Sequence, residues 1–511
     1  MTTAALLAWT SPVIDWHALA PEIVLTGVVC LLLLIDMTLL ERAKPIMAGL
    51  TGIGFLAALV PVLTLAVSDH STRSLFGGAY VVDHPALLLK ALFIATGYVV
   101  TLISTNYVAE GDYWESEYYI LMVSSVLGMS VMSSARDLVS IFVAFELLSI
   151  PTYLLAAWRK RDVESNEAGM KYFLFGVFAT GLLLYGMSLL YGVAGSTNLA
   201  RIGEVISSTK NTAAISLAMV LVLVGFAFKV SSVPFHNWAP DTYEGAPTPV
   251  TAFLAVASKG AGFVALINVI HYCFIAGGAS GKAEVIRPVL FAMAALSMTV
   301  GNVIALKQTN VVRLLAYSGI SHAGFILAPF VVAGDRPVES LTAIVTYLVI
   351  YAAMNLGAFA AVIAVARRTG SAELDTWGGL FEYAPGLTVA MTIFLASLTG
   401  IPPMGGWYVK FMSFRAVLSA GTGWGYAIGI VMALNVAIAA AYYMRIAKVM
   451  WIDPVPHGDR TPVRVPASLR SALAITVTAT LLFGILPNLV SGPATPPANA
   501  FPTASAATPG K

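Results

Sequence analysis

The sequence is poor in charged residues, and this shortage already limits what the chain can be. Charged residues make up 11% of its 511 residues and hydrophobic residues 58%, whereas soluble domains are about 25% charged and 45–50% apolar. A soluble protein needs polar surface to cover its cores, so this composition and a mean hydropathy of +0.83 exclude a water-soluble chain. The lipid bilayer is the expected surroundings of most of the sequence.

Cysteine is almost absent, and no run of like charge occurs. Two cysteines are too few for an iron–sulfur cluster, which takes about four thiolates, and neither CxxC nor HExxH is present, so no metal is expected on this chain. The balance of 28 basic and 26 acidic residues excludes nucleic acid as a main partner. A glycine string at Gly260 and Gly262 lies in an apolar segment after no strand, so nucleotide binding is not expected. Any redox centre therefore belongs to another chain.

What the sequence does contain is a succession of long apolar runs. Spanning helices need about 20 apolar residues, and cutting the sequence at charges and Pro/Gly clusters leaves about fourteen segments. They run approximately over 22–40, 46–67, 85–105, 118–135, 137–158, 171–194, 213–238, 247–275, 288–308, 311–333, 340–366, 385–418, 425–450 and 468–491. A short surface helix is expected at 199–208, and the Ala/Pro/Thr-rich tail after Gly492 is expected to be disordered. The prediction is an all-α polytopic membrane protein.

Basic residues collect on one set of alternate loops, at about twice the number of the other set. The positive-inside tendency therefore places both termini outside and gives an even number of spans. The chain is rich in alanine, glycine and valine, which favours a multi-pass protein of a bacterial inner membrane.

Two interrupted helices resemble one another. Ser232–Trp238 and Gly400–Trp407 both contain an aliphatic residue, proline and tryptophan in that order, and paired interruptions in two halves of a chain are typical of transporters built from internal repeats. The residues expected to break these helices are Pro234, Pro402, Pro403, Gly405 and Gly406.

Four charges lie where a membrane helix should have none. Glu146 follows Arg136 by ten residues and Lys259 follows Pro249 by ten, which at 1.5 Å per residue places each about 15 Å deep, near the bilayer midplane. Lys229 precedes Pro234, and Lys410 follows a break in which Pro402 and Pro403 release the carbonyls of residues 398 and 399. A charge at the helix centre costs at least about 2.5–3.5 kcal/mol, so each of the four requires an explanation.

A structural explanation is that Glu146 and Lys229 form one inert ion pair while the other lysines reach an interface. It leaves Lys259 and Lys410 without an acidic partner, and a buried lysine without a fixed partner can change its protonation state. His322, whose imidazole titrates near neutral pH, could connect the lysines, and His236 at the first break could face an aqueous mouth. These residues predict a proton relay.

Other charges lie nearer the ends of segments, where snorkelling to the interface is the simpler explanation. A structural role is expected for this group, which consists of Asp36, Lys90, Lys307 and Arg415.

Three strings resemble the antiporter-like subunits of respiratory complex I. They are FELLS at 145–149, PFHNWAPDTYEGAPTP at 234–249 and AYSGISH at 316–322. The resemblance extends from about residue 21 to residue 489, and the long middle string is its most specific part. Lys410, and the absence of a long lateral helix after the last segment, separate the chain from subunits M and L.

The resemblance implies a fold and a set of roles. It implies two inverted five-helix repeats with broken helices, at 118–275 and 288–452, between an N-terminal three-helix segment at 1–117 and a C-terminal transmembrane helix at 453–491, with the tail at 492–511. Glu146 would pair with Lys229, Lys259 would hold the central proton, His322 would connect, and Lys410 would release the proton.

The resemblance also implies partners and excludes redox groups from this chain. FMN, iron–sulfur clusters and quinone are expected on partner subunits, and the expected neighbours are antiporter-like subunits M and L and small subunits such as K and J. Quinone reduction elsewhere would change the field on the Glu146–Lys229 pair and drive a proton toward Lys410. Two alternatives remain open: the large subunit of a multi-subunit sodium/proton antiporter, and a structural membrane protein with vestigial charges.

Overall fold

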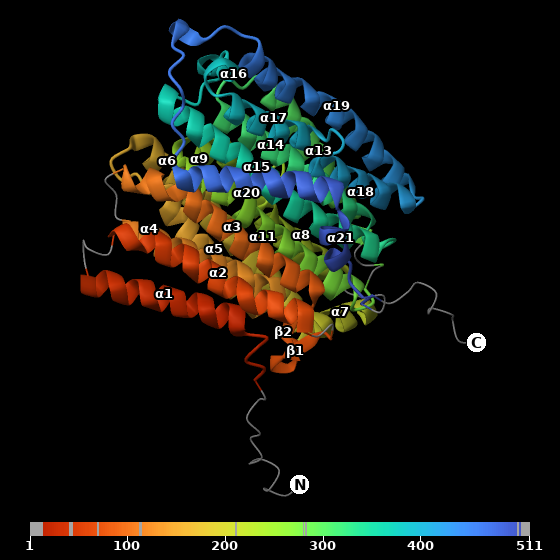
Figure 1. Cartoon of the computed structure of the whole chain (residues 1–511). Helices are drawn as coiled ribbons and strands as arrows, with labels where there is room; N and C mark the ends of the chain where they lie inside the picture. Colours follow the sequence, from red (N-terminus) through yellow and green to blue (C-terminus); the bar gives the residue numbers. More distant parts are fainter. Residues whose placement is uncertain are drawn as a thin grey trace, which may run out of the picture.

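The computed structural model describes residues 14–39, 44–68, 71–111, 115–209, 212–279, 281, 284–497 and 500–501. Residues 1–13 of the expected N-terminal segment and residues 498, 499 and 502–511 of the expected tail lie outside this description. In the described part the chain is a bundle of roughly parallel and antiparallel helices (Figure 1).

Three helices and a small hairpin form the N-terminal part. They are α1 (Ala20–Leu39), α2 (Lys44–Ser68), β1 (Arg73–Leu75), β2 (Tyr80–Val82) and α3 (His84–Ala109). The hairpin is antiparallel, with Arg73 opposite Val82 and Leu75 opposite Tyr80. Figure 1 shows α1 and α2 at one end of the molecule and α19 at the other.

The middle of the chain forms the next group of helices. It contains α4 (Glu115–Ser134), α5 (Leu138–Ala156), α6 (Val163–Ala194), the short α7 (Leu199–Ser208), α8 (Thr212–Lys229) and α9 (Trp238–Gly245). A continuous helix follows, made of α10 (Thr248–Phe253), the π-helical η4 (Leu254–Ser258), α11 (Lys259–Ile267) and the π-helical η5 (Asn268–Ile275).

The last part of the chain adds the remaining helices. They are α13 (Arg287–Ala305), α14 (Val311–Leu327), α15 (Pro337–Thr369), α16 (Leu380–Tyr383), α17 (Pro385–Thr399), α18 (Gly405–Ser419), α19 (Gly423–Trp451), α20 (Ala467–Ile485) and α21 (Asn488–Ala494). Short 3-10 turns link the elements at η3 (Phe76–Gly78), η6 (Glu284–Ile286), η7 (Ala328–Val332), η8 (Leu374–Trp377) and η9 (Pro456–Gly458).

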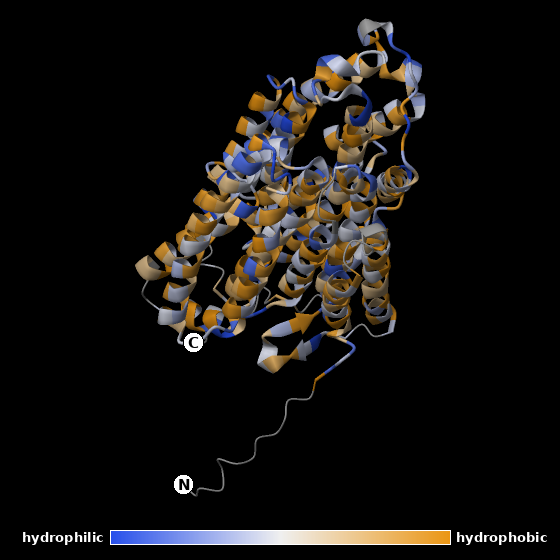
Figure 2. Cartoon of the chain, turned by 90° about the vertical axis from the view of Figure 1, so that its left-hand side faces the viewer, coloured by the Kyte–Doolittle hydropathy of each residue, from blue (hydrophilic) through white to orange (hydrophobic). Residues whose placement is uncertain are grey.

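Each of the fourteen expected segments contains a helix, and the protein is a polytopic all-α membrane protein. Eleven helices of the described residues are long and apolar enough to cross a membrane. Hydrophobic residues cover their sides, while hydrophilic residues gather in the loops between them (Figure 2). The expected segments 213–238 and 385–418 are interrupted after Lys229 and between Thr399 and Gly405.

Three of the described helices form the interior of the bundle. The most apolar window of the helix from Thr248 to Ile275 is 100% buried, and those of α15 and of the span Val311–Val332, which begins with α14, are each 94% buried. The corresponding window of α1 is only 17% buried. The C-terminal helix α20 lies against both α15 and α3, and Ser468 at its start donates a hydrogen bond to Asn106 of α3 at 2.8 Å. Polar or charged side chains on the interior helices are thus removed from both lipid and water.

Capping residues fix where the helices of the predicted site begin. Asp137 accepts hydrogen bonds from the backbone N–H groups of Val139 and Ser140 at the start of α5, and Asn310 does the same at the start of α14. Asp162 caps α6, which is why this helix starts at Val163 and not near 171 as predicted. These caps set the depth of every later side chain on the same helix.

The expectation that nothing after Gly492 is buried is wrong for the described part of the tail. Helix α21 continues to Ala494, which is buried. Phe501 is also buried, with its ring 6.0 Å from that of His271 and 6.2 Å from that of Tyr272. One aromatic residue in an otherwise small and polar tail is enough to dock it against η5.

Candidate functional site

Lys229 is the last residue of α8 and is almost completely buried. Its Nζ donates hydrogen bonds to Ser149 Oγ at 2.8 Å and to the hydroxyl of Tyr172 at 3.1 Å. The chain then leaves the helix: Ser231 has a positive φ of 58°, and the indole of Trp238 donates to the carbonyl of Phe228 at 3.0 Å. Lys229 therefore lies at the end of a helix, beside backbone that has left the helical hydrogen-bond pattern.

The predicted direct pair of Glu146 with Lys229 is not formed. Among the described residues no carboxylate oxygen lies within 4.0 Å of Lys229 Nζ, and Glu146 Oε1 is buried without a hydrogen-bond partner. Lys229 instead reaches Ser149, which follows Glu146 by three residues on α5 and so lies on nearly the same face. The lysine reaches the predicted helix but contacts it one turn further along.

Lys259 occupies the centre of the molecule, directly after the π-helical η4. Its side chain is buried, and its Nζ donates to the backbone carbonyl of Gly319 on α14 at 2.8 Å. Within the described ranges it has no carboxylate within 4.0 Å. π-Turns occur frequently at functional sites, and here one sits next to a buried ammonium group that contacts only a neutral carbonyl.

The glycine string beside Lys259 serves helix packing. Gly262 on α11 faces α8, where an added Cβ would lie 2.9 Å from Val230 Cγ1 and 3.1 Å from Lys229 Cβ. The missing side chain lets α11 approach the end of α8 and brings the two lysine-bearing helices together.

His322 on α14 is buried and held by two tyrosines. Its Nδ1 lies 2.8 Å from the hydroxyl of Tyr347, and its Nε2 lies 3.2 Å from the hydroxyl of Tyr443. Tyr443 also lies 2.5 Å from Ser318 Oγ. The imidazole therefore joins a chain of hydroxyl groups on α14, α15 and α19.

Lys410 on α18 lies where the prolines were expected to release backbone carbonyls. Its Nζ donates to the carbonyls of Leu398 and Thr399, both at 2.9 Å, and lies 4.9 Å from the centre of the Phe325 ring. The break is very tight at Gly406, where an added Cβ would lie 1.8 Å from the carbonyl oxygen of Ser397. Only glycine permits this approach.

His236 lies in the first break and is half-buried. Its Nδ1 has no hydrogen-bond partner among the described residues. The structure thus gathers Lys229, Lys259, His322 and Lys410 in the interior, while the described residues show no hydrogen bond from His236 to any of these four side chains.

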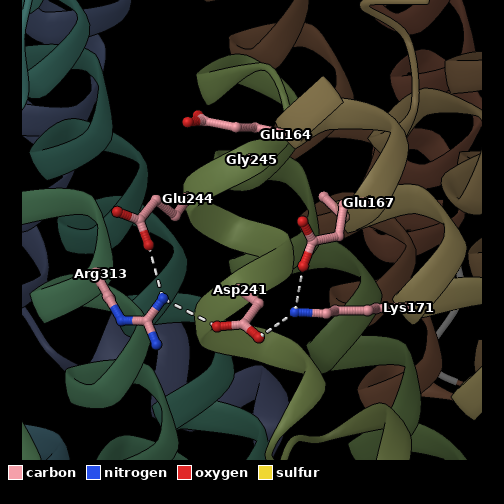
Figure 3. Close-up of a pocket in the computed structure, with 8 residues that line it drawn as sticks. Glu164, Glu167, Lys171, Asp241, Glu244, Gly245 and Arg313 are labelled. Carbon is pink, nitrogen blue, oxygen red and sulfur yellow. Dashed lines mark hydrogen bonds and ion pairs between the residues drawn. The ribbon is translucent and has the colours of Figure 1, made fainter. Parts of the chain in front are cut away.

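A charged network surrounds helix α9, which follows the first break (Figure 3). Asp241 on α9 accepts from Lys171 at 2.8 Å and from Arg313 at 2.9 Å, so it links α6 to α14. Burial alone would raise the pKa of Asp241, but hydrogen bonds from these two cations outweigh it and hold the pKa below its ordinary value. The network lines an open cavity of about 280 Å³.

The remaining members of this network are acidic. Glu244 lies 2.6 Å from Arg313 and Glu167 lies 2.7 Å from Lys171. Glu164 lies at the edge of the cavity and takes part in none of the interactions drawn (Figure 3). Asp241 and Glu244 belong to the string at 234–249 that carried the family resemblance, so that string joins neighbouring helices at one end of the bundle.

A second ionic cluster lies near the N-terminus and, unlike the first, is buried; it corrects the assignment of Lys90. This lysine was expected to snorkel, but it is fully buried, with its Nζ 2.9 Å from Glu22 Oε1 and 2.7 Å from the hydroxyl of Tyr80. Ser130 also donates to Glu22 Oε1, at 2.6 Å. The cluster ties α1 to α3 and α4.

The described residues contain no group of three or more His, Cys, Asp or Glu side chains arranged to hold a metal ion. The interior side chains described above carry amine, imidazole and hydroxyl groups, which can bind and pass protons.

Comparison with known proteins assigns the family. The profile described as "NADH:quinone oxidoreductase/Mrp antiporter, TM" matches residues 135–434. A curated relative from Trichlorobacter lovleyi, named NADH-quinone oxidoreductase subunit N, is 36% identical over 481 residues, which are 93% of this chain and 96% of the relative. The chain belongs to the subunit N family of NADH-quinone oxidoreductases.

Solved structures share the fold of the chain. A chain of respiratory complex I from Thermus thermophilus is 30% identical with a TM-score of 0.75, covering 92% of this chain and 98% of that one. A chain of the Mrp complex from a Dietzia species has a TM-score of 0.82 but only 21% identity, which shows a shared fold alone. The chain is thus a proton-translocating membrane subunit of an NADH-quinone oxidoreductase complex.

The sequence analysis of this subunit N chain did not predict several polar residues around the site. They carry hydroxyl groups and lie on helix faces that are otherwise apolar: Ser149, Tyr172, Tyr347, Tyr351 and Tyr443. The spacing of four between Tyr347 and Tyr351 is a helical-face signal that could have found two of them.

Proposed function

We propose that protons cross this chain through a relay of Lys229, Lys259, His322 and Lys410. The observation that carries the proposal is the environment of Lys259, a buried ammonium group hydrogen-bonded to a neutral carbonyl and without a carboxylate within 4.0 Å in the described part of the chain. A buried charge without a fixed counter-ion is costly to maintain, so nearby charges can easily change its protonation state. This is the property that a proton carrier needs.

Hydroxyl groups supply the connections between the relay lysines. Lys229 donates to Tyr172 and Ser149, and His322 contacts Tyr347 and Tyr443. Because a hydroxyl both donates and accepts, it can accept a proton on one side while giving one up on the other. The relay therefore needs no ionised tyrosine.

Helix breaks supply the polar surroundings of the terminal lysines. Pro234 lies beyond Lys229, and the break formed by Pro402, Pro403, Gly405 and Gly406 offers carbonyls to Lys410. Discontinuous helices of this kind form ion sites in transporters. We propose Lys410 as the releasing group and His236 as a group facing an aqueous mouth.

Glu146 acts on Lys229 through its charge and not through a direct bond. Its side chain is half-buried, and the buried Oε1 atom has no partner on the described part of this chain. A change of charge near Glu146 alters the field at Lys229 and then at Lys259. We propose this as the point where redox energy from elsewhere in the complex reaches the relay.

The redox chemistry belongs to other chains of the complex in this proposal. FMN, iron–sulfur clusters and quinone bind partner subunits, and this chain acts as a translocase without a redox centre. Its neighbours are antiporter-like subunits M and L and small subunits such as K and J. The subunit lies in a bacterial inner membrane with both termini outside, and its two breaks belong to inverted repeats at 118–275 and 288–452.

Purification of the whole complex through a C-terminal tag tests the assignment of partners. We expect flavin, iron–sulfur subunits and NADH-dependent quinone reduction to co-purify with the tagged chain. A preparation with only small membrane partners, and with sodium-dependent proton exchange in vesicles, would instead support the antiporter alternative.

Reconstitution of the complex with Lys410→Met tests the relay. Proton translocation per NADH oxidised should fall several-fold, since the break carbonyls lose their proton-carrying partner. The matched control is Lys448→Met, which removes a lysine that is 63% exposed and paired with Asp453. Equal pumping by both variants would contradict the relay.

A further inference from the structure

Helix α15 presents a polar stripe to the interior, of which the proposed relay uses only Tyr347. Tyr347, Tyr351 and Asn355 are spaced by four residues and so share one face of the helix, and all three are buried. Tyr347 binds His322. The hydroxyl of Tyr351 and both amide atoms of Asn355 have no hydrogen-bond partner among the described residues.

A buried hydroxyl without a partner requires an explanation. Leaving such a group unpaired costs about 1–3 kcal/mol, and a phenylalanine would fill the same space without that cost. The location of the Tyr351 side chain indicates a function, because it lies close to two groups of the relay, Lys259 and His322.

The Tyr351 hydroxyl and Lys259 Nζ lie against the same glycine. A Cβ built on Gly319 would lie 3.0 Å from Lys259 Nζ and 3.2 Å from the Tyr351 oxygen, so these two atoms are separated by at most the sum of the two distances, about 6.2 Å. One water molecule making two hydrogen bonds of about 2.8–3.0 Å spans nearly that gap.

On its other side Tyr351 meets the histidine cluster. Its ring centre lies 5.1 Å from that of His322. Both nitrogens of His322 are taken by Tyr347 and Tyr443, and the Tyr443 hydroxyl lies 2.5 Å from Ser318, the residue next to Gly319. Tyr351 therefore has its hydroxyl near Lys259 and its ring beside His322, whose Nε2 contacts the Tyr443 hydroxyl.

We propose that Tyr351 carries the proton from Lys259 to His322, together with the hydroxyl of Tyr443. This inference rests on the proposed relay and names the group that joins its two halves. The Lys259 ammonium loses a proton to the bridging water, and that water gives one to the Tyr351 oxygen. The Tyr351 hydroxyl has no direct hydrogen-bond partner among the described residues, so its own proton passes through a second water to the Tyr443 oxygen. Tyr443 gives its hydroxyl proton to Nε2 of His322, which becomes an imidazolium while Lys259 is left as a neutral amine. Tyr351 is a neutral phenol before and after the step.

The test uses the assembled complex in vesicles with Tyr351→Phe, which removes only the hydroxyl. Proton translocation per NADH should fall several-fold while the complex stays assembled. The control is Tyr118→Phe, which removes a buried hydroxyl that lies 2.9 Å from Ser104, away from the relay. Normal pumping by Tyr351→Phe would overturn the proposal.

A graded replacement separates proton transfer from a structural role. Placing 3-fluorotyrosine and then 3,5-difluorotyrosine at position 351 makes the phenol progressively more acidic with little change in shape. The pumping rate of the variants should change in the order of their phenol acidity. If the hydroxyl has only a structural role, the pumping rate should be the same in all of them. This series also decides the matter if Tyr351→Phe fails to assemble.

Lys259→Met, measured beside these variants, distinguishes failure of the proposed relay from failure of the role proposed for Tyr351. If Lys259→Met loses pumping and the Tyr351 variants do not, the relay stands and the role of Tyr351 is overturned. If Lys259→Met pumps normally, the relay itself fails, and the proposal for Tyr351 fails with it.

Discussion

Lys90 and Lys259 are both buried lysines on membrane helices, yet they have opposite surroundings. Lys90 lies 2.9 Å from the carboxylate of Glu22 and also contacts Tyr80, whereas Lys259 meets a neutral backbone carbonyl. A carboxylate at hydrogen-bond distance fixes the charge of the first lysine and joins α1 to α3. The comparison teaches that the partner of a buried charge, more than its depth, separates a structural lysine from one that can exchange a proton.

The largest expected effect comes from removing the unpaired lysine. In Lys259→Met we expect assembly to be retained and proton translocation to fall at least about tenfold, because methionine fills similar space but carries no proton. Vesicle measurements of proton uptake per NADH oxidised give the result. If Lys259→Met pumped as well as the unmodified complex, Lys259 would be no more a proton carrier than Lys90.

Removing the paired lysine should instead affect stability. Lys90→Met leaves Glu22 buried without a counter-ion, and breaking a buried pair in this way costs about 3–5 kcal/mol. We expect a lower midpoint of thermal unfolding in detergent and less assembled complex. The complex that does assemble should pump normally.

The double variant Glu22→Gln/Lys90→Met sharpens the same contrast. It removes both charges while glutamine keeps an oxygen for Ser130, so most of the lost stability should return. If the double variant were as unstable as Lys90→Met, the ion pair would not be the source of the effect.

A smaller effect is expected from a single methyl group beside Lys259. In Gly319→Ala the new Cβ would crowd Lys259 Nζ at 3.0 Å and the Tyr351 hydroxyl at 3.2 Å, so both must shift and pumping should fall a few-fold. Gly181→Ala on α6 is the matched control, since no atom lies within 4 Å of its added Cβ. Equal pumping by the two variants would show that proton translocation tolerates displacement of Lys259 Nζ and the Tyr351 hydroxyl.

The smallest effect concerns Asp241, which is paired like Lys90 but lies at the end of the bundle. Its pKa is lower in the folded protein than in the unfolded chain, so its contribution to stability is present above the unfolded value of about 3.9 and is lost as the pH falls through the folded pKa. Asp241→Asn should lower stability at pH 7 by no more than about 1 kcal/mol, because the pair is partly exposed to solvent.

The pH dependence of unfolding checks this prediction. The difference in unfolding midpoint between the unmodified protein and Asp241→Asn should shrink as the pH is lowered toward 3. A difference that stays constant over that range would point to packing and not to charge.

The sequence predicted the helices and the second break well because each depends on local signals. Apolar runs gave the spans, and the spacing from Pro402 and Pro403 predicted the two carbonyls that Lys410 contacts. The family and its membrane function also followed from contiguous strings. None of these inferences required knowledge of which helices touch.

The interactions that were missed all depend on contacts between distant helices. Glu22 lies near the start of α1, and nothing in its neighbourhood shows that it faces Lys90. Likewise the rotation of α5 against α8 decides that Lys229 reaches Ser149 and not Glu146. A shift of one turn along a helix changes the partner, and residue spacing cannot resolve such a shift between two chain segments.

The position of α20 has a consequence for how the chain is made. Helix α3 is among the first to leave the ribosome, yet one face of it packs against α15 and α20, which are synthesised hundreds of residues later. Until α15 and α20 have been made, that face of α3 lacks the neighbours against which it packs. Synthesis of α20 thus adds a late part of the bundle, and a nascent chain stopped before residue 467 leaves α3 without this lateral support.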